Sequence, residues 1–311
     1  LHVRSRRQRQ MCIRDRLKGV PKSLIYRVVR SGEVRVNKGR AHVDTRLQSG
    51  DEVRIPPIRY TEKESEHSAP PLKLSEMPPI LFEDQNIMVV DKLAGMASHG
   101  GSGISYGLIE RMRASRPELP FLELVHRLDR GTSGVLVLAK TRKALVRLHE
   151  MIREGEMHKT YQALVKGDWQ NDRQHAKFPL FKYVTPSGER RVRVDPENGL
   201  PSHSIFRLKE RFGPVSLVEV DLLTGRTHQI RVHAAELGFP LVGDEKYGDF
   251  AFNDEVAHGS LGVPFKRMFL HSGKICFHHP ITGEELEIEA PLPKDCVELI
   301  EVLEQRKAQN K

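Results

Sequence analysis

The sequence predicts an α+β protein with a long mixed, mainly antiparallel sheet, preceded by a small basic domain. Three observations support this prediction: strand-like alternation recurs along residues 81–311, helical patterns lie between these segments, and positive charge concentrates before residue 61. A chain of 311 residues is long enough for two domains, because single domains typically hold about 100 to 200 residues.

Positive charge is concentrated in the first part of the chain. Residues 1–60 contain 16 Lys and Arg and 5 Asp and Glu, a net charge of +11, which leaves −2 of the total +9 for residues 61–311. This imbalance indicates that the N-terminal part binds a polyanion such as nucleic acid. A basic surface that contacts only solvent would give the same count.

Neither a membrane nor a secreted environment is indicated. No apolar run approaches the roughly 20 residues that a membrane-spanning helix needs. The three cysteines, Cys12, Cys276 and Cys296, are scattered and lack the CxxC spacing typical of thiolate metal sites and redox pairs. We therefore expect a cytoplasmic protein without membrane contact and without a bound metal.

Residues 1–16 are not expected to belong to a packed domain. They contain six arginines and almost no apolar pattern. The run QRQMCIRDR at 8–16 also resembles a translated sequencing adapter, so we expect this segment to be non-native or disordered. Residues 17–60 alone still carry a net charge of +6, and the basic character of the N-terminal part therefore does not depend on the first segment.

Residues 17–60 are expected to form a small RNA-binding domain. A helical stretch at 22–32 is followed by short strands at 33–37 and 51–57, with a KGR turn after the first strand. In the helical stretch the apolar residues repeat at helical spacing and the cations lie off this stripe, which leaves a basic exposed face. The pattern resembles the S4 RNA-binding module. The residues that this resemblance assigns to RNA contact are Lys22, Arg27, Arg30 and Lys38.

A polar, proline-rich segment separates this domain from the rest of the chain. Residues 61–80 contain four prolines, which predicts an exposed linker, and a second domain is expected over 81–311. Its strands are predicted at 87–92, 134–140, 159–167, 206–210, 216–225, 269–280 and 285–291. Its helices are predicted at 107–114, 142–157 and 227–238.

Hydrophobic periodicity supports the individual elements. At 216–225, apolar residues alternate with acidic residues, which indicates a strand with one buried face. At 142–157, apolar residues recur every three or four positions and form one stripe, which indicates a helix packed on a core. The stripe consists of Ala144, Leu145, Leu148, Met151 and Ile152.

The segment HRLDRGTSGVLVLAK at 126–140 carries the most informative chemistry. It places Asp129 between Arg127 and Arg130, in a glycine-containing loop that leads into a buried strand. Neighbouring cations stabilise an ionised carboxylate, so Asp129 should be charged at neutral pH and available as a nucleophile or base. Taken alone, the pattern favours a structural Arg–Asp–Arg cluster that holds a loop.

Two further segments favour a catalytic interpretation. HRLDRGTSGVLVLAK, KTYQALVKG at 159–167 and LLTGRTHQIRVHAAELGFPLVGDEKYG at 222–248 resemble successive motifs of the RluA family of pseudouridine synthases. Together with the S4-like module, the resemblance extends from Leu17 to about Pro291. It implies the pseudouridine synthase fold and a cofactor-free, metal-free isomerisation of specific uridines to pseudouridine in 23S ribosomal RNA of the large subunit.

The resemblance assigns three catalytic residues. The family's catalytic aspartate falls on Asp129, its active-site tyrosine on Tyr161 and its active-site arginine on Arg231. Tyr161 would stack on the target base or take part in proton transfer, whereas a lone strand tyrosine otherwise packs in a core. Arg231 lies beside Ile230 at the border of the predicted apolar stripe, from where it can reach inward and pair with Asp129.

RNA contacts are also expected in the second domain. Arg226, Thr227 and Gln229 lie at the start of the predicted helix, where free backbone amides favour a phosphate, and Arg226 is assigned to RNA on this ground. Arg127 and Arg130 are assigned to RNA as well. The arginines of the ERRVRV segment at 189–194 fit an RNA-facing hairpin and a solvated edge strand equally well.

Other interpretations fit parts of the sequence. His271, His278 and His279 lack carboxylate or cysteine partners at ligand spacing, so we interpret them as strand-end or surface residues rather than a metal site. A non-catalytic RNA-binding or ribosome-assembly protein would share the basic module. A hydrolase of glycosidic bonds would usually need two carboxylates, and no second acid stands out near Asp129. We expect a monomer whose partner is large-subunit ribosomal RNA.

Overall fold

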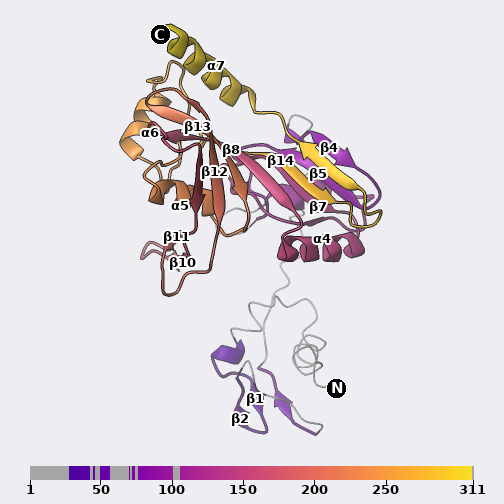
Figure 1. The fold of residues 1–311 in the computed structure, drawn as a ribbon. Coiled ribbons are helices and arrows are strands. Elements are labelled where there is room, and N and C mark those ends of the chain that lie inside the picture. The colour runs from indigo at the N-terminus through magenta and orange to yellow at the C-terminus, as the bar shows by residue number, and fades with distance from the viewer. Residues whose placement is uncertain are drawn as a thin grey trace. The chain divides into compact units, whose positions relative to one another are not determined.

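The computed structural model describes residues 28–42, 45, 50–56, 70, 72–73, 76–100 and 106–309. The chain divides into two compact units, Leu1–Ser68 and Ala69–Lys311 (Figure 1). The segment 1–16 lies outside the described residues, and so do Lys22 and Arg27, two of the cations assigned to RNA contact. The other two, Arg30 and Lys38, are exposed side chains of the first unit.

The first unit contains a small three-stranded sheet. Residues 28–30 are helical, and the strands are β1 (Arg35–Val36), β2 (Gly39–Arg40) and β3 (Val53–Arg54), with β1 in the middle and both pairs antiparallel. The turn between β1 and β2 consists of Asn37 and Lys38, whose φ angles of 49° and 67° are typical of a type I′ hairpin turn. The expected KGR turn is displaced by one residue, because the pair with positive φ ends before Gly39.

A ten-stranded mixed sheet forms the centre of the second unit (Figure 1). Its strands are β4 (Ile80–Glu83), β5 (Ile87–Lys92), β6 (Glu123–Leu124), β7 (Ser133–Ala139), β8 (His158–Lys166), β9 (Arg173–Ala176), β12 (Ser204–Arg211), β13 (Val215–Leu222), β14 (Leu270–His278) and β15 (Glu285–Glu289). They lie in the order β4-β5-β7-β14-β8-β13-β12-β9, with β6 paired to β7 and β15 to β14. All pairs are antiparallel except β7 with β14. The prediction of a long, mainly antiparallel mixed sheet is confirmed.

The second unit begins earlier in the chain than the composition suggested. Leu72 is buried in the main core, and its backbone N–H donates to Ser115 Oγ at 2.7 Å. Strand β4 starts at Ile80, inside the expected linker 61–80. Prolines and charged residues dominate this segment, so its composition does not reveal that Leu72 packs in the core. The second unit therefore begins at Ala69 rather than at the expected residue 81.

Strand β7 is apolar because both of its faces are buried. All of its residues are buried. Leu136 and Leu138 pack into one core cluster, whereas Val135 and Val137 point to the opposite face and pack into a second. Burial of each such side chain contributes about 1.5–3 kcal/mol, so the strand is a rigid base for the loop that precedes it.

Helix α4 (Arg142–Glu154) covers the second of these clusters. Thr141 caps its start by accepting a hydrogen bond from Ala144 N at 3.2 Å, and Gly155 ends it in the left-handed conformation, with φ of 77°. Leu148 packs with the valines of β7 in the second cluster. The predicted apolar stripe of this helix therefore faces the sheet.

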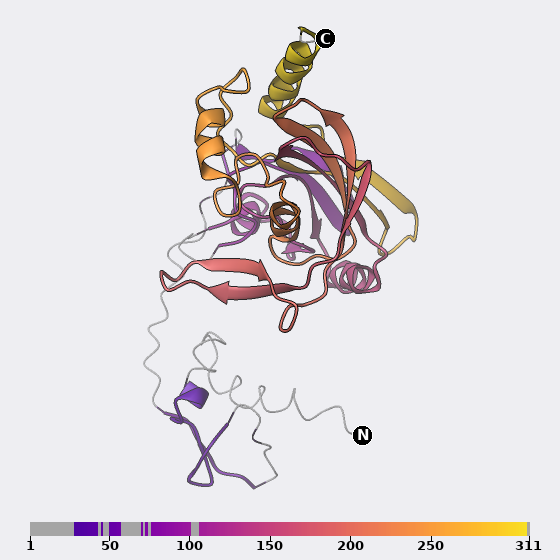
Figure 2. The same ribbon diagram turned by 60° about the vertical axis from the view of Figure 1, so that its left-hand side comes forward.

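The remaining elements flank the sheet. β10 (Leu180–Val184) and β11 (Arg190–Val194) form a separate antiparallel hairpin, which Figure 2 shows set apart from the main sheet. The ERRVRV arginines thus lie on a hairpin, and their contact with RNA remains a prediction. The other helices are α3 (Leu108–Ser115), α5 (Gln229–Glu236), α6 (Phe250–Ala257) and α7 (Lys294–Gln309). In the part of the chain that the structure describes, none of the helices has the length and apolarity to cross a membrane.

Strands β7 and β14 approach each other closely at the start of β7. The two strands pair in parallel through Gly134 and Ser272. Gly134 has φ of 108°, and a Cβ atom there would lie 2.2 Å from the Ser272 carbonyl oxygen. Any other residue at this position would push the two strands apart, because the backbone of Ser272 cannot yield as a flexible side chain would.

Candidate active site

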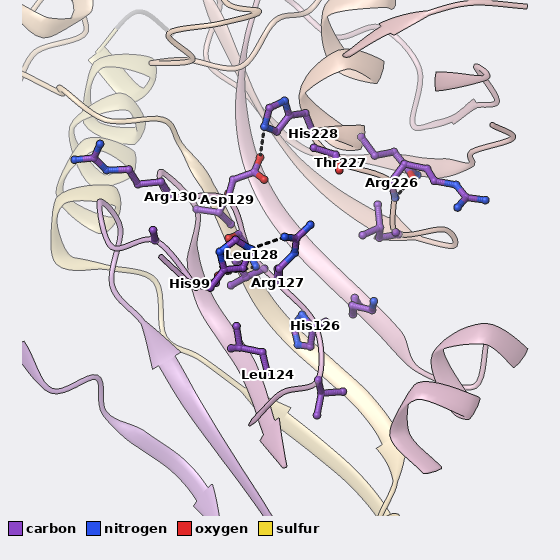
Figure 3. Close-up of a pocket in the computed structure, with 18 of the residues that line it drawn as sticks. His99, Leu124, His126, Arg127, Leu128, Asp129, Arg130, Arg226, Thr227 and His228 are labelled. Atoms are coloured by element: carbon purple, nitrogen blue, oxygen red, sulfur yellow. Dashed lines mark hydrogen bonds and ion pairs between the residues drawn. The ribbon is translucent and has the colours of Figure 1, made fainter. Parts of the chain in front are cut away.

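A cavity of about 980 Å³ opens in the second unit (Figure 3). It is lined by the loop before β7, by the residues that lead into α5, and by side chains of α3, α4 and β8. Asp129, Tyr161 and Arg231 all line it, although they come from three separate segments of the chain. The fold therefore brings together the three residues that the motifs assign to catalysis.

Arg231 holds Asp129 in place. Its Nη1 donates to Asp129 Oδ2 at 3.0 Å, which is the expected pairing. The rest of the guanidinium donates to both carboxylate oxygens of Asp244, Nε to Oδ2 and Nη2 to Oδ1, each at 2.7 Å. The Tyr247 ring lies 5.1 Å from the guanidinium carbon. A planar guanidinium with all these partners is fixed, and it fixes the carboxylate that it shares.

Asp244 is the buried anchor of this arrangement. Its side chain is 0% exposed, and Oδ1 also accepts the backbone N–H groups of Lys246 at 2.8 Å and Tyr247 at 3.1 Å. Burial acts to raise the pKa of Asp244, but its hydrogen bonds with Arg231 outweigh burial and lower it. Burial likewise opposes the charge of Arg231, and the hydrogen bonds with Asp244 raise the pKa of Arg231. Asp129 therefore receives its hydrogen bond from a permanent cation.

The arginines adjacent to Asp129 in the sequence do not pair with it. Arg127 Nη1 contacts His99 Nε2 (Figure 3), and Arg130 Nε donates to the Gly95 carbonyl oxygen at 2.9 Å. The Arg–Asp–Arg cluster, which was the structural alternative to a catalytic site, is therefore absent from this described loop, because successive side chains of the loop point in different directions. Arg127 and Arg130 do line the cavity, and their assignment to RNA stays a prediction.

A buried lysine holds the loop that carries Asp129. Lys92 is 0% exposed, and its Nζ donates to the carbonyl oxygens of Leu93 at 2.9 Å, Met96 at 2.7 Å and Arg130 at 3.4 Å. Burial lowers the pKa of Lys92 to about 7, against the attraction of nearby Asp129. Its place at the end of an apolar strand was the only signal for this role in the sequence.

Tyr161 combines packing with access to the cavity. It is 5% exposed, belongs to the main core cluster and lines the cavity. Burial raises the pKa of Tyr161 to about 12, so its hydroxyl keeps its proton at neutral pH. A neutral phenol can stack on the target base or donate its proton, so both roles considered for this residue stay predictions.

His228 is a candidate that the sequence reasoning missed. It directly precedes α5, and its Nε2 lies 3.9 Å from Asp129 Oδ2 (Figure 3). Its Nδ1 lies 2.7 Å from the hydroxyl oxygen of Tyr247. The signal available in the sequence was the position of this histidine three residues before Arg231, within the motif GRTHQIR.

The start of α5 is less open to a phosphate than expected. The side-chain oxygen of Gln229 accepts the Arg226 N–H at 3.0 Å, and the Gln229 N–H donates to the Arg226 carbonyl oxygen at 3.2 Å. Two amides that were expected to be free are thus bonded within the loop. The side chain of Arg226 is exposed and lines the cavity, so its guanidinium is the group that can meet RNA.

The three histidines near the ends of β14 have structural partners or face solvent. His271 is buried, with Nδ1 3.0 Å from Ser133 Oγ, and His279 is buried, with Nε2 2.9 Å from Asp84 Oδ2. His278 is exposed. They are strand-end residues as interpreted, but two of the three are not at the surface. Among the described residues, no group of His, Cys, Asp and Glu is arranged to hold a metal ion.

Comparison with known proteins identifies the family. Residues 86–236 match the model of a family described as RNA pseudouridylate synthase. The chain is 50% identical over 295 residues to the ribosomal large subunit pseudouridine synthase C of Salmonella typhi, and the match covers 94% of this chain and 91% of that protein. This chain belongs to the RNA pseudouridylate synthase family. The resemblance seen in the motifs is thereby confirmed.

Other members of the family show the same relation. The ribosomal large subunit pseudouridine synthase C of Escherichia coli (strain K12) is 51% identical over 284 residues, 90% of this chain and 88% of that one. The solved structure of human RNA pseudouridylate synthase domain containing 4 matches 72% of this chain and 92% of its own, with a TM-score of 0.60 at 23% identity. That of human RNA pseudouridylate synthase domain containing 1 matches 74% and 95%, with a TM-score of 0.56 at 26% identity. The pseudouridine synthase fold is confirmed.

Proposed function

We propose that this RNA pseudouridine synthase isomerises specific uridines of large-subunit ribosomal RNA, with Asp129 as its catalytic carboxylate. The observation that carries the site assignment is the ion pair of Asp129 with the buried Arg231, at a cavity that Tyr161 also lines. A charged carboxylate held by a fixed cation in a cavity suits a nucleophile or base. Relatives named ribosomal large subunit pseudouridine synthase C, at 50% and 51% identity, support this substrate class.

The chemistry of pseudouridine formation accounts for the composition of the site. The N1–C1′ bond of uridine breaks, the uracil rotates, and a C5–C1′ bond forms. C5 loses a proton and N1 gains one, so no electrons are exchanged with a redox partner and no cofactor is needed. Asp129 acts at the sugar or at the base, Arg231 orients its carboxylate, and Tyr161 contacts the detached base with its ring.

The target uridine must leave its stack to reach Asp129. Extrusion of a nucleotide costs free energy, which aromatic stacking and phosphate contacts can offset. We assign the phosphate contacts to Arg127, Arg130 and Arg226, which line the same cavity as Asp129. The combination of cations and a buried tyrosine in one cavity agrees with an extruded nucleotide as the ligand.

Hydrolysis of a glycosidic bond is the main competing chemistry, and the carboxylates of the cavity disfavour it. Such enzymes usually place two carboxyl groups on either side of the bond. The other acidic residues that line the cavity are Glu110 and Glu123. Glu110 Oε2 accepts the backbone N–H of Gly107 at 2.8 Å, and Glu123 pairs with Arg113 at 2.7 Å. Both are therefore engaged in structural contacts.

Release of tritium from RNA labelled at C5 of uridine tests the proposal. The isomerase releases the label, because C5 exchanges its hydrogen for the bond to C1′. A hydrolase would release labelled uracil instead, and a binding protein would release neither. Unmodified large-subunit ribosomal RNA is the substrate and small-subunit ribosomal RNA the control. Failure to release tritium from either RNA would contradict the proposed reaction, and equal release from both would contradict the proposed substrate.

We also propose that residues 17–60 form an S4-like RNA-binding domain, that residues 1–16 are non-native or disordered, and that the protein acts in the cytoplasm as a monomer. The net charge of +6 over residues 17–60 and the exposed side chains of Arg30 and Lys38 support RNA contact by this part of the chain.

A chain that starts at Ala69 should bind RNA more weakly and with a smaller salt dependence. Each phosphate contact that is lost reduces the slope of log K against log salt concentration by about 0.7–0.9. Tritium release at saturating RNA should persist, because the cavity lies within the second unit. Filter binding at several salt concentrations measures the change. Identical affinity of the full and shortened chains at every salt concentration would rule out the RNA-binding role of the first unit.

Lys159 is expected to bind a phosphate of the substrate. It lies on β8 two residues before Tyr161, on the same face of the strand, and lines the cavity. Burial lowers the pKa of Lys159, and among the described residues no carboxylate forms an ion pair with it. We expect Lys159→Met to raise KM about tenfold and to reduce the salt slope by about one phosphate contact, with kcat near wild type.

Steady-state kinetics and salt-dependent binding measure these effects. Lys143→Met is the matched control, because Lys143 is an exposed lysine of α4 that does not line the cavity. The control should leave both KM and the salt slope near their wild-type values. If Lys159→Met behaved like the control, the ammonium of Lys159 would not contact phosphate.

A further inference from the structure

His228 has an unfavourable backbone conformation that directs its ring toward Asp129. Its φ is 54° and its ψ is 22°, a left-handed conformation that a histidine keeps only when surrounding contacts enforce it. Gln229 supplies these contacts, since its side-chain oxygen accepts the Arg226 N–H and its Nε2 donates to the His203 carbonyl oxygen, both at 3.0 Å. The preceding loop is therefore fixed and the imidazole faces the catalytic carboxylate (Figure 3).

The hydrogen bonds of Tyr247 favour one neutral tautomer of His228. The Tyr247 hydroxyl oxygen accepts the Val192 N–H at 2.9 Å and lies 2.7 Å from His228 Nδ1. Burial raises the pKa of Tyr247 to about 12, so the hydroxyl keeps its proton and can donate it to Nδ1. A neutral imidazole that accepts at Nδ1 carries its own proton on Nε2, the nitrogen nearest Asp129.

In this tautomer His228 presents a neutral N–H group to the carboxylate. Burial lowers the pKa of His228, against the attraction of Asp129, so the ring adds no second full charge beside Arg231. The Nε2 to Oδ2 distance of 3.9 Å exceeds that of a hydrogen bond, and such contacts in active sites often shorten when substrate binds. Arg231 also donates to Oδ2, so both groups face the same oxygen of Asp129.

Tyr247 connects this pair to the β10–β11 hairpin. Val192 lies on β11 and packs with Leu180 of β10 against Val232 of α5, in a small cluster that Tyr247 also joins. The Val192 N–H points out of the hairpin to Tyr247 rather than to β10. The hydrogen bond from the Val192 N–H to the Tyr247 hydroxyl oxygen orients this hydroxyl toward His228. It exists only while the hairpin is docked on α5.

We propose that His228 and Tyr247 form a positioning pair that holds Asp129 through Oδ2, leaves Oδ1 for the reaction, and is complete only when the β10–β11 hairpin is docked on α5. The inference rests on the proposed catalytic role of Asp129. His228 and Tyr247 act through that carboxylate, and the inference requires no contact of either with the substrate.

Tyr247→Phe is the first test, because it removes the hydroxyl and keeps the ring against Arg231. We expect kcat to fall between about tenfold and a hundredfold, with KM and RNA affinity within about twofold of wild type, since the carboxylate loses orientation while the binding surface is retained. Single-turnover tritium release measures kcat, and thermal unfolding verifies the fold. A wild-type kcat in the folded variant would overturn the proposal.

A double-mutant cycle with His228→Gln separates positioning from a general structural effect. The Gln amide offers an N–H donor near the place of Nε2 that does not depend on Tyr247. Tyr247→Phe should therefore have no further effect in the His228→Gln background. The kcat of the double variant should match that of His228→Gln alone within about twofold. Independent, multiplicative losses in the double variant would show that the two residues do not act as a pair.

Thr282→Val is the matched control. Thr282 Oγ1 lies 3.0 Å from His279 Nδ1, so the substitution removes a hydroxyl that contacts an imidazole outside the cavity. It should leave kcat unchanged. If Asp129→Asn retained turnover, the proposed function of the site would fail. If Asp129→Asn is inactive and Tyr247→Phe is fully active, only the positioning pair fails.

Discussion

Asp129→Asn is expected to lower turnover on the order of 10⁴-fold while the protein stays folded. The amide keeps the shape of the side chain but can act neither as an anionic nucleophile nor as a base. Arg231 remains paired with the buried Asp244, so the substitution leaves no isolated charge in the interior. Tritium release at saturating RNA measures the loss, and circular dichroism on heating verifies the fold.

RNA affinity distinguishes a loss of chemistry from a loss of binding. Asp129→Asn should bind RNA within about twofold of wild type, because phosphate contacts dominate affinity and a carboxylate makes none. Asp254→Asn is the matched control, since its side chain is 77% exposed on α6, and it should be fully active. Full turnover by Asp129→Asn would refute its assignment as the catalytic carboxylate.

Arg231→Ala is expected to destabilise the second unit by about 3–5 kcal/mol, in addition to removing activity. The substitution leaves Asp244 charged and fully buried, with only the backbone N–H groups of Lys246 and Tyr247 as donors. Asp129 loses its 3.0 Å hydrogen bond at the same time. Denaturant unfolding measures the stability, and tritium release at a temperature where the variant is folded measures the activity.

A double variant separates the two roles of Arg231. In Arg231→Met with Asp244→Asn, both buried charges are absent and the Asn oxygen can still accept from Lys246 and Tyr247. Most of the lost stability should return, because removing a whole buried pair costs less than removing one partner. Activity should not return, since Asp129 still lacks its cation. Recovery of turnover in the double variant would contradict the proposed role of Arg231.

The elements predicted from strong periodicity are present in the structure, and several other elements were missed. The expected strand at 87–92 is β5 as the structure has it, and the helix at 227–238 contains α5. β6 and β9 were not predicted, because two and four residues are too short for an alternation to be recognised. α7 was also missed, although its buried residues Cys296, Leu299 and Leu303 repeat at helical spacing.

Motif spacing and side-chain periodicity are properties of the chain order, so the sequence was enough to identify the family, most of the central sheet and three candidate catalytic residues, all of which line the cavity. The motifs led us to expect the pairing of Arg231 with Asp129, but the tertiary structure was needed to show that Arg127 and Arg130 do not share it and that Asp244 anchors Arg231. Arg127 and Arg130 are the neighbours of Asp129 along the chain, yet loop torsions turn them away, whereas Arg231, 102 residues distant, is brought to it by the packing of α5. A carboxylate pairs with the cation that buried contacts hold in place. In this fold Asp244, to which the sequence analysis assigned no role, holds Arg231 through two hydrogen bonds.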